Sequence, residues 1–447
     1  MATDNMTPEL LEKMIAHMTS QLGQQDTKIA KCVFPISELK NKKYVPIGCK
    51  ENTVALFEFY GITVRYNEMT KLPEVTMPRC KFNKDTEFNS ILSEISDCAR
   101  LQGYSPEVTE RNLYAIASEN SYHPVRDWIM SEKWDGQSRL KALYNTIVSE
   151  TPIKEMLMEK WLISAVAVLM YGTEYQNDDH DIEGFRGTEG VMIFTGTQGK
   201  AKTQWFESLA PRKMRVIKDG LHLDISNKDS IMAGVSTWIG ELGEIDTTFS
   251  KSSVSQLKAF VTKKADEIRP PYAKASDNYQ RRTVFCGSVN QYTFLNDKDG
   301  RRWWVISVSD IDKDHGINMQ QLWAEIYETK YLKCTPYWLE PEEREQLRIC
   351  NLSHETQSSI EQLLDEYVFD PADELVAKRC ATKAKWYSAT QLYLELTGRT
   401  DATKLVLNEI SAWCRSRKLP EQKPNKFRCL VDPTSLHERQ NARQMWR

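Results

Sequence analysis

A short apolar run that ends in a glycine-containing turn and a Lys-Thr pair constrains the fold of this chain more than any other feature. Residues 191–195 read Val-Met-Ile-Phe-Thr and predict a buried β-strand, and residues 196–203 read Gly-Thr-Gln-Gly-Lys-Ala-Lys-Thr. This order is typical of a loop that binds the phosphates of a nucleoside triphosphate, because backbone N–H groups and a helix N-terminus then face the anion. We expect Lys202 to reach the β- and γ-phosphate oxygens and the Thr203 hydroxyl to ligate Mg²⁺.

One position departs from the usual pattern of such a loop. Ala201 occupies the place of the second glycine, and alanine adds a methyl group that tolerates only an unstrained φ. With this mismatch, the motif alone does not distinguish a phosphate-binding loop from a chance turn, so the rest of the chain must decide. The expected ATP-binding residues are Gly196, Thr197, Gln198, Gly199, Lys200, Ala201, Lys202, Thr203 and Gln204.

A second predicted strand ends in acidic residues, which an ATPase needs to hold Mg²⁺ and polarise water. Residues 235–241 read Val-Ser-Thr-Trp-Ile-Gly-Glu, and the strand follows Lys202 at a separation that two adjacent strands of one sheet would allow. We expect Glu241 to serve in the Mg²⁺ shell or to activate water, with Glu244 as its helper. Ordinary surface carboxylates at a strand end are the alternative.

A third predicted strand, residues 283–290, ends at Asn290, whose amide can hydrogen-bond the attacking water or the γ-phosphate. A simple turn-forming asparagine is the alternative. Arg301 and Arg302 follow on a predicted turn backed by two tryptophans. They could project a guanidinium into the phosphate site of a neighbouring subunit, where such an arginine contributes roughly 10³ to 10⁵ in rate. The alternative is a salt-bridged turn over an apolar strand.

Taken in order, these motifs resemble the virulence-associated protein E family, which comprises phage- and mobile-element-encoded P-loop ATPases similar to superfamily 3 helicases. The likeness covers about residues 100 to 310 and rests on residues 123–128, 134–140, 196–203, 238–246, 257–260, 269–272 and 299–304. It implies an AAA+-like core, a ring that is commonly a hexamer, ATP and Mg²⁺ as cofactors, DNA translocation and a role in phage genome replication. It further implies that Lys202 and Thr203 are the Walker A pair and Glu241 with Glu244 the Walker B acids. Asn290 would be sensor 1, and Arg301 or Arg302 the arginine finger.

The interval between the second and third strands, residues 258–282, carries the channel-lining hairpin or loop in superfamily 3 rings. Basic groups near an aromatic side chain suit single-stranded DNA, because phosphates take the charge and a base can stack. A solvated charged face, supported by Asp266 and Glu267, is the alternative. The expected DNA-binding residues are Lys258, Lys263, Lys264, Arg269, Tyr272 and Lys274, with Arg281 and Arg282 in the same interval.

Patterning along the chain predicts an α/β protein with several regions. We expect an N-terminal helix and link (1–30), a small mixed region of short β-like runs (31–84), and a helical domain (85–175). An AAA+-like ATPase core (176–318) and a helical connector (319–375) follow, and a basic C-terminal module (376–447) ends the chain.

The C-terminal module contains thirteen basic residues against six acidic ones from Cys380 onward. Residues 388–396 and 403–418 read as helices, with Ser388 as an N-cap, and residues 427–431 as a strand. A helix, a turn, a helix and a β-ribbon in a basic segment fit a winged-helix module, and a solvated helical cap fits equally well.

Composition limits the remaining classes. The formal net charge of −3 does not indicate a general nucleic-acid binder, so any such surface must be local. The first residues lack the apolar core of a signal peptide, and the longest apolar window, residues 161–170, is too short to span a bilayer. Ten cysteines without a C-x-x-C pair favour a protein of a reducing cytoplasm, here that of a bacterial host. We expect no metal site at His123 or at His180, and read the first as a helix start and the second as a surface loop.

Three functions remain open from the sequence. The first is a ring-forming DNA helicase or translocase that acts in mobile-element replication. The second is an ATP-regulated initiator whose specificity lies in the C-terminal module, and the third is a regulatory ATPase that does not respond to DNA.

Overall fold

A computed structural model describes residues 30–78, 83, 86–173, 186–243, 254–269, 276–295, 300–355, 359–372, 383–423 and 426–432. The chain divides into two compact units, of which the first holds most residues up to 347 and the second holds most residues from 348 onward. The expected N-terminal helix, Glu244, Tyr272, Lys274 and the loop around His180 lie outside the described residues.

The first unit is built around a six-stranded sheet with the order β6-β13-β7-β12-β9-β8. All neighbouring pairs are parallel except β6 with β13. The expected α/β core with a parallel sheet is therefore confirmed. The strands are β6 (Ile147–Ser149), β7 (Val191–Thr195), β8 (Ile217–Leu221), β9 (Ile239–Leu242), β12 (Val284–Val289) and β13 (Trp303–Ile311).

The sheet order corrects one expectation. The strand that carries Glu241 is not adjacent to β7, because β12 pairs with both β7 and β9 and so separates them. The strand before Glu241 is also shorter than predicted, since Val235 ends helix α10 (Lys228–Val235) and pairing begins only at Ile239. Val235 and Trp238 are both buried, so their hydrophobicity alone did not separate the helix end from the strand.

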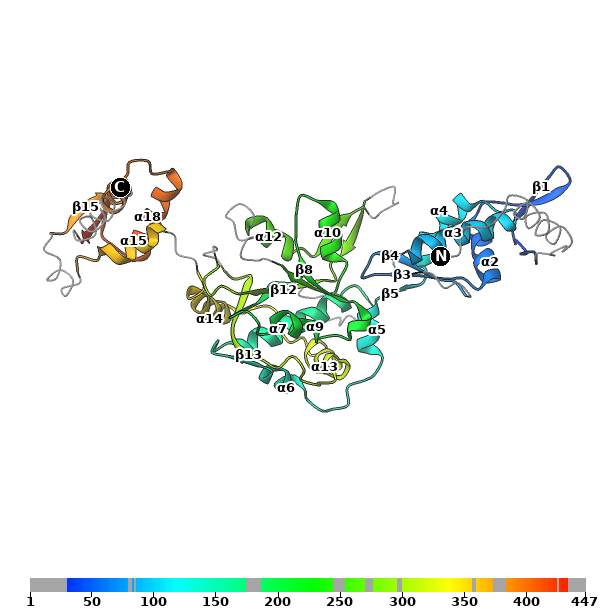
Figure 1. Cartoon of the computed structure of the whole chain (residues 1–447), viewed down its shortest axis with the longest axis horizontal. Coiled ribbons are helices and arrows are strands. Elements are labelled where there is room, and N and C mark those ends of the chain that lie inside the picture. The colour runs from blue at the N-terminus through cyan, green and yellow to red at the C-terminus, as the bar shows by residue number, and fades with distance from the viewer. Residues whose placement is uncertain are drawn as a thin grey trace, which may run out of the picture. The chain divides into compact units, whose positions relative to one another are not determined.

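Helices cover both faces of this sheet (Figure 1). Helix α7 (Lys154–Met170) and helix α13 (Met319–Ile326) lie on one side, and α10 and α12 (Val254–Val261) on the other. Buried tryptophans fix the first side by donating indole N–H bonds: Trp161 to the Phe285 carbonyl, Trp238 to that of Ala165, and Trp323 to that of Leu209. These bonds let large apolar rings fill the core while their polar atoms stay satisfied.

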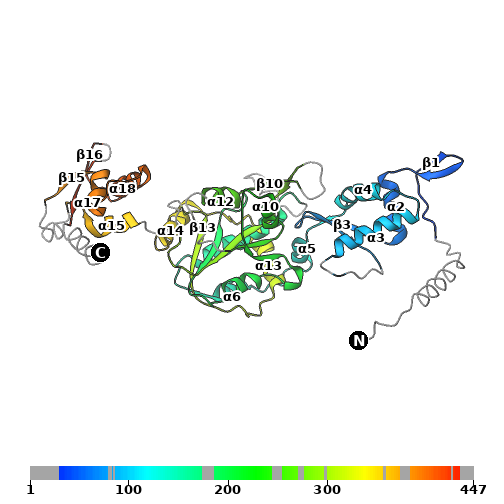
Figure 2. The same ribbon diagram turned by 45° about the horizontal axis from the view of Figure 1, so that its top comes forward.

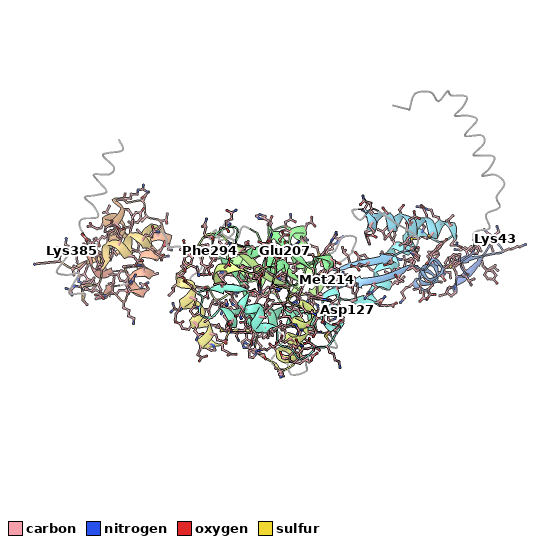
Figure 3. The ribbon with its side chains drawn as sticks, turned by 60° about the horizontal axis from the view of Figure 1, so that its bottom comes forward. Lys43, Asp127, Glu207, Met214, Phe294 and Lys385 are labelled. Carbon is pink, nitrogen blue, oxygen red and sulfur yellow. The ribbon has the colours of Figure 1, made fainter. Side chains whose placement is uncertain are left out.

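The remaining elements of the core are short. They are α5 (Pro124–Met130), α6 (Leu140–Asn145), α9 (Lys202–Glu207), the 3₁₀ turn Arg212–Met214, the π-helical turn Tyr327–Tyr331 and α14 (Pro341–Leu352). A two-stranded hairpin, β10 (Ala265–Ile268) with β11 (Asp277–Gln280), projects from the segment between α12 and β12 (Figure 2). Glu207 and Met214 mark the end of α9 and the turn after it in Figure 3.

The N-terminal part of this unit has its own cores. Its elements are β1 (Ser37–Lys40), β2 (Lys43–Pro46), α2 (Lys50–Tyr60), β3 (Thr63–Asn67), β4 (Leu72–Thr76), α3 (Glu87–Leu101), α4 (Pro106–Ser118) and β5 (Ser121–Tyr122). Phe57, Val64, Ile95 and Leu113 pack together here, so α3 and α4 belong with β3, whereas α7 belongs to the central core. Residues 85–175 thus contribute to more than one core.

Helix α2 was not expected, because residues 31–81 were predicted to hold only short β-like runs. Its apolar residues are aromatic or β-branched in part and do not follow a helical period strictly. Gly61, with φ of 66°, ends the helix in the left-handed conformation and was the readable signal.

The second unit has the order α15 (Ser359–Tyr367), β14 (Val368–Phe369), β15 (Lys385–Ser388), α17 (Ala389–Thr397), α18 (Lys404–Ser416), β16 (Glu421–Lys423) and β17 (Lys426–Val431). Strand β17 pairs antiparallel with β14, β15 and β16. The two predicted helices and the predicted strand are confirmed, and Ser388 forms a capping box with Gln391. Among the residues that the structure describes, no helix has the length and apolar character needed to span a membrane.

Candidate functional site

The site begins where β7 ends. Gly196 has φ of 150°, and a Cβ at this position would lie 2.3 Å from the Val308 carbonyl oxygen of β13. Only glycine permits that approach, because no other residue lacks a Cβ. Gly199, with φ of 85°, supplies a second bend in an otherwise open space. The two glycines therefore shape the turn, and the sequence prediction of a glycine-dependent loop after a buried strand is confirmed.

Ala201 does not have the unstrained φ that we expected. Its φ of 54° and ψ of 28° place it in the left-handed region, where a Cβ costs roughly 1–2 kcal/mol. The residue before the helix thus takes the conformation that the usual glycine would take without strain. The loop geometry is kept although the residue that favours it is absent.

Helix α9 starts directly after Ala201, and its first-turn N–H groups have no intrahelical acceptor. Trp205 and Phe206 are buried against Phe194 of β7, Phe206 with its ring stacked and Trp205 with its ring tilted, which fixes the helix start against the strand. The helix is only six residues long, so its dipole adds less than the sequence suggested. Gln204, the last of the expected ATP-binding residues, is exposed, so its side chain does not displace core residues.

Lys202 is 6% exposed and folds back over the loop. Its Nζ donates to the carbonyl oxygens of Gly196 at 2.6 Å and Thr197 at 3.1 Å, and to Oδ1 of Asn290 at 3.0 Å. All three acceptors are uncharged, and burial lowers the pKa of the Lys202 ammonium. The structure thus places Asn290, predicted as the third piece of the site, against Lys202.

Glu241 is 4% exposed at the end of β9. Its Oε1 accepts hydrogen bonds from Oγ1 of Thr203 at 2.7 Å and from Oγ of Ser288 at 2.7 Å, and the two hydroxyls are 3.2 Å apart. Burial raises the pKa of the Glu241 carboxyl, and the two hydroxyl bonds oppose that shift. A buried acid and the Thr203 hydroxyl are therefore in direct contact, as the Mg²⁺ prediction requires.

The two buried charged groups suit a metal-bound phosphate. Mg²⁺ takes oxygen ligands such as a hydroxyl and a carboxylate, and it is commonly held together with substrate phosphates. Thr203 and Glu241 offer those oxygens, while Lys202 offers a buried positive charge whose acceptors are neutral. The donor set therefore fits ATP with Mg²⁺, the cofactors expected from the sequence.

Ser288 is the site residue that sequence reasoning missed. It lies two positions before Asn290 on β12, and alternate residues of a strand face the same side. This alternation was the sequence signal that could have placed Ser288 in the site. It did not suffice, because the sequence did not predict that β12 lies between β7 and β9.

Arg301 and Arg302 are not brought to the loop of their own chain. They precede β13, whose first residue pairs with Val191 at the start of β7, whereas Gly196 follows the end of β7. The length of β7 corresponds to about 13 Å at about 3.3 Å per residue. The two arginines therefore lie at the opposite edge of the sheet, which leaves the predicted contact in trans as a prediction.

The expected DNA-binding residues divide into two groups. Lys263, Lys264 and Arg269 are exposed, and Lys258 is half-buried. Arg281 and Arg282 are buried instead: Arg281 forms a bidentate pair with Asp266, and Arg282 donates to the carbonyl oxygens of residues 168, 169 and 171. These two arginines, which the sequence grouped with the DNA-facing residues, hold the base of the hairpin.

The upstream motifs have structural roles. His123 is the N-cap of α5, and its imidazole accepts a hydrogen bond from the Arg126 N–H. The expected helix start at this residue is confirmed. The segment around Asp135 is tied to α13, since Gln321 accepts from the Asp135 N–H and Glu325 accepts from Ser138 and Arg139. These contacts fix a loop on the core.

Comparison with known proteins agrees with the sequence motifs. The family described as virulence-associated protein E-like domain matches residues 129–356. Solved apo structures of the NrS-1 C-terminal region are similar to this chain at 12% identity and a TM-score of 0.44, and they cover 85% of this chain and 98% or 99% of theirs. A third such structure has 14% identity and a TM-score of 0.41, with coverage of 85% and 98%. No curated protein matches the chain.

Proposed function

The chain belongs to the virulence-associated protein E-like domain family, and on that premise we propose that it is an ATP-hydrolysing, ring-forming helicase or translocase that acts on DNA in phage or mobile-element replication. One observation carries the proposal: Lys202 and Thr203 begin helix α9, Glu241 lies in β9 and Asn290 follows β12, and direct hydrogen bonds join Lys202 to Asn290 and Thr203 to Glu241. This is the grouping of cation, hydroxyl, acid and amide that phosphoryl transfer uses.

In this proposal the phosphates of ATP bind residues 196–204 and draw Lys202 away from its neutral acceptors. Mg²⁺, when bound with ATP, neutralises charge that develops on the phosphates. Glu241 then orients the attacking water and accepts its proton as the oxygen bonds to the γ-phosphorus and the bond to ADP breaks. Burial raises the pKa of the Glu241 carboxyl and so makes it a stronger base than an exposed glutamate.

In this proposal a positively charged side chain of a neighbouring copy also stabilises the transition state. We assign Arg301 or Arg302 to the phosphate site of the adjacent subunit, because neither can reach the loop of its own chain. The family resemblance implies a ring, commonly a hexamer. The hairpin β10–β11 and the residues around it, among them Lys258 of α12, Lys263, Lys264 and Arg269, would line the channel for single-stranded DNA. Tyr272 and Lys274, also expected to bind DNA, lie outside the described residues.

Steady-state ATP hydrolysis with and without single-stranded DNA, measured beside the Lys202→Ala variant, tests this proposal. Stimulation by DNA that disappears in the variant supports a DNA-coupled motor, and a strand-displacement assay follows. Activity that ignores DNA supports the regulatory ATPase instead. Binding of ATP without hydrolysis supports the initiator.

The second unit favours the initiator as a second candidate. Its order α15-β14-β15-α17-α18-β16-β17, with β16 and β17 as a hairpin, supports a winged-helix module in which α18 enters the major groove. Lys404 and Asn408 are exposed on α18, and Trp386 is 38% exposed opposite Arg428 on the paired strands. We expect Lys404→Gln with Asn408→Ala to abolish duplex binding and to leave ATP hydrolysis intact if this candidate holds.

A further inference from the structure

An arginine-lined pocket lies at the edge of the sheet where β7 and β13 begin. Its volume is about 180 Å³, and its lining includes Arg186, Glu189, Arg301, Arg302 and Arg344. Arg301 and Arg302 were singled out from the sequence, but Arg186 and Arg344 come from other segments. The pocket is therefore assembled by the fold from three parts of the chain.

The segment before β7 holds Arg186 beside the other arginines. The Arg186 guanidinium stacks over the Trp338 ring at 4.1 Å, and its backbone N–H donates to the Tyr337 hydroxyl. Gly190 permits the close approach, because a Cβ there would lie 2.1 Å from the Trp304 ring. This packing brings the start of the strand against the turn that carries Arg301.

The other arginines are also positioned. Arg344 donates from Nε to the Leu339 carbonyl at 2.8 Å. The Arg301 carbonyl accepts from the Trp304 indole, and the Arg302 carbonyl accepts from the Val191 N–H. The backbone beneath each guanidinium is thus fixed before any ligand arrives, which reduces the entropic cost of binding one.

The charge of this lining calls for an anion. Four guanidiniums surround the pocket, and the one carboxylate in the lining, Glu189, lies 4.0 Å from Arg344. Guanidinium groups bind phosphate in bidentate geometry, so a phosphate group matches both the charge and the donor pattern. Glu189 then acts as an internal counter-ion that a phosphate can replace at Arg344.

We propose that this pocket binds the phosphates of a nucleotide held in the loop of a second copy of this chain, and that Arg186 and Arg344 act there together with Arg301 and Arg302. The inference rests on the proposed function. The pocket cannot serve its own loop, because the full length of β7 separates the two. A second copy supplies both the anion and a fixed orientation for it.

Subunit mixing tests the proposal. Arg186→Gln and Arg344→Gln are expected to lose at least about tenfold in ATP hydrolysis while ATP binding is unchanged, because each keeps its own loop. Mixing either variant with Lys202→Ala, itself inactive, should restore activity, because the Lys202→Ala subunit lends an intact pocket to an intact loop. Arg212→Gln is the matched control, since Arg212 is exposed and pairs with Glu207 away from this pocket.

Three results of the mixing experiment would overturn the inference: variants as active as Arg212→Gln, loss of ATP binding to the isolated subunit, or no recovery of activity on mixing.

Titration of inorganic phosphate into the Lys202→Ala protein distinguishes the two sources of phosphate, a nucleotide held by a second copy and free phosphate. Tight binding that Arg344→Gln removes would assign the pocket to free phosphate instead. If the wild-type protein hydrolyses no ATP, the proposed function fails. Self-association that depends on ATP, measured by light scattering, then decides whether the pocket binds a nucleotide held by a second copy. Loss of self-association in Arg344→Gln alone supports the pocket, and its persistence refutes it.

Discussion

The Lys202 ammonium and the Asn290 side chain amide are joined by a hydrogen bond of 3.0 Å across 88 positions of sequence. The bond connects the start of α9 to the residue that follows β12, and β12 in turn pairs with β9, which carries Glu241. The cation and the acid of the site are therefore both positioned by one central strand.

Lys202→Ala removes the buried cation of the loop. We expect ATP hydrolysis to fall by at least about 100-fold, since a preorganised charge at the reacting phosphate is lost. Steady-state hydrolysis measures the effect. Lys141→Ala is the control, because Lys141 is exposed on α6 and pairs with Glu155 at 2.7 Å. Equal loss in both variants would contradict a specific role for Lys202.

Glu241→Gln should raise the thermal stability of the protein and abolish ATP hydrolysis. Burial raises the pKa of this carboxyl above its ordinary value of 4.5, so the ionised form destabilises the fold at neutral pH. The variant is expected to bind ATP, to lose hydrolysis, and to melt at a higher temperature than the wild type at pH 7. The difference in Tm should close as the pH falls below 4.5, where the carboxyl is protonated in both the folded and the unfolded state. A difference that does not change with pH would contradict this account.

Ser288→Ala leaves Glu241 with one fewer hydroxyl donor. Because that bond lowers the pKa of the carboxyl, its loss should raise the pKa further. We expect the acidic limb of the pH–rate profile to move to higher pH while ATP affinity changes little. Ser288→Thr keeps the hydroxyl and serves as the control. An unshifted profile in Ser288→Ala would separate this serine from catalysis.

Ala201→Gly should stabilise the protein. The residue has φ of 54°, and removing the Cβ relieves left-handed strain of about 1 kcal/mol. Urea unfolding measures the change in free energy of unfolding. Ala412→Gly, in the middle of α18, should shift it in the opposite direction by about 1 kcal/mol. Destabilisation by Ala201→Gly would mean that the loop adopts another conformation.

Lys263→Gln with Lys264→Gln tests the proposed DNA contact of the segment between α12 and β10. Both lysines are exposed, so the folded state should tolerate the change. Stimulation of ATP hydrolysis by single-stranded DNA should weaken. The slope of log affinity for DNA against log salt concentration should become shallower by about 0.7 for each phosphate that the protein no longer neutralises. Lys313→Gln, at a partly exposed site outside this interval, should retain both properties.

Local patterns predicted much of the site. The strand 191–195, the start of α9 at Lys202, the end of β12 at Asn290 and the capped helix after Ser388 follow from apolar runs, glycine and cap residues that act within a few positions. Such signals depend only on neighbouring residues and survive without tertiary context.

Features that depend on long-range pairing could not be predicted. The insertion of β12 between β7 and β9 decides that Ser288 meets Glu241, and no local pattern encodes strand order. Arg281 and Arg282 look the same in sequence as exposed arginines, yet Asp266 and the end of α7 bury them. Arg186 and Arg344 gather only because Trp338 and Leu339 fold beside them.

The anchoring of Arg282 has a mechanical consequence for the chain between the hairpin and the nucleotide site. Residues 281–282 join β11 to β12, and they are pinned by Asp266 on one side and by the carbonyl end of α7 on the other. These hydrogen bonds fix the backbone where the hairpin joins the sheet. A movement of the hairpin would therefore have to displace the Arg282 guanidinium from the end of α7 before it could pass along β12 to Asn290 and its bond to Lys202.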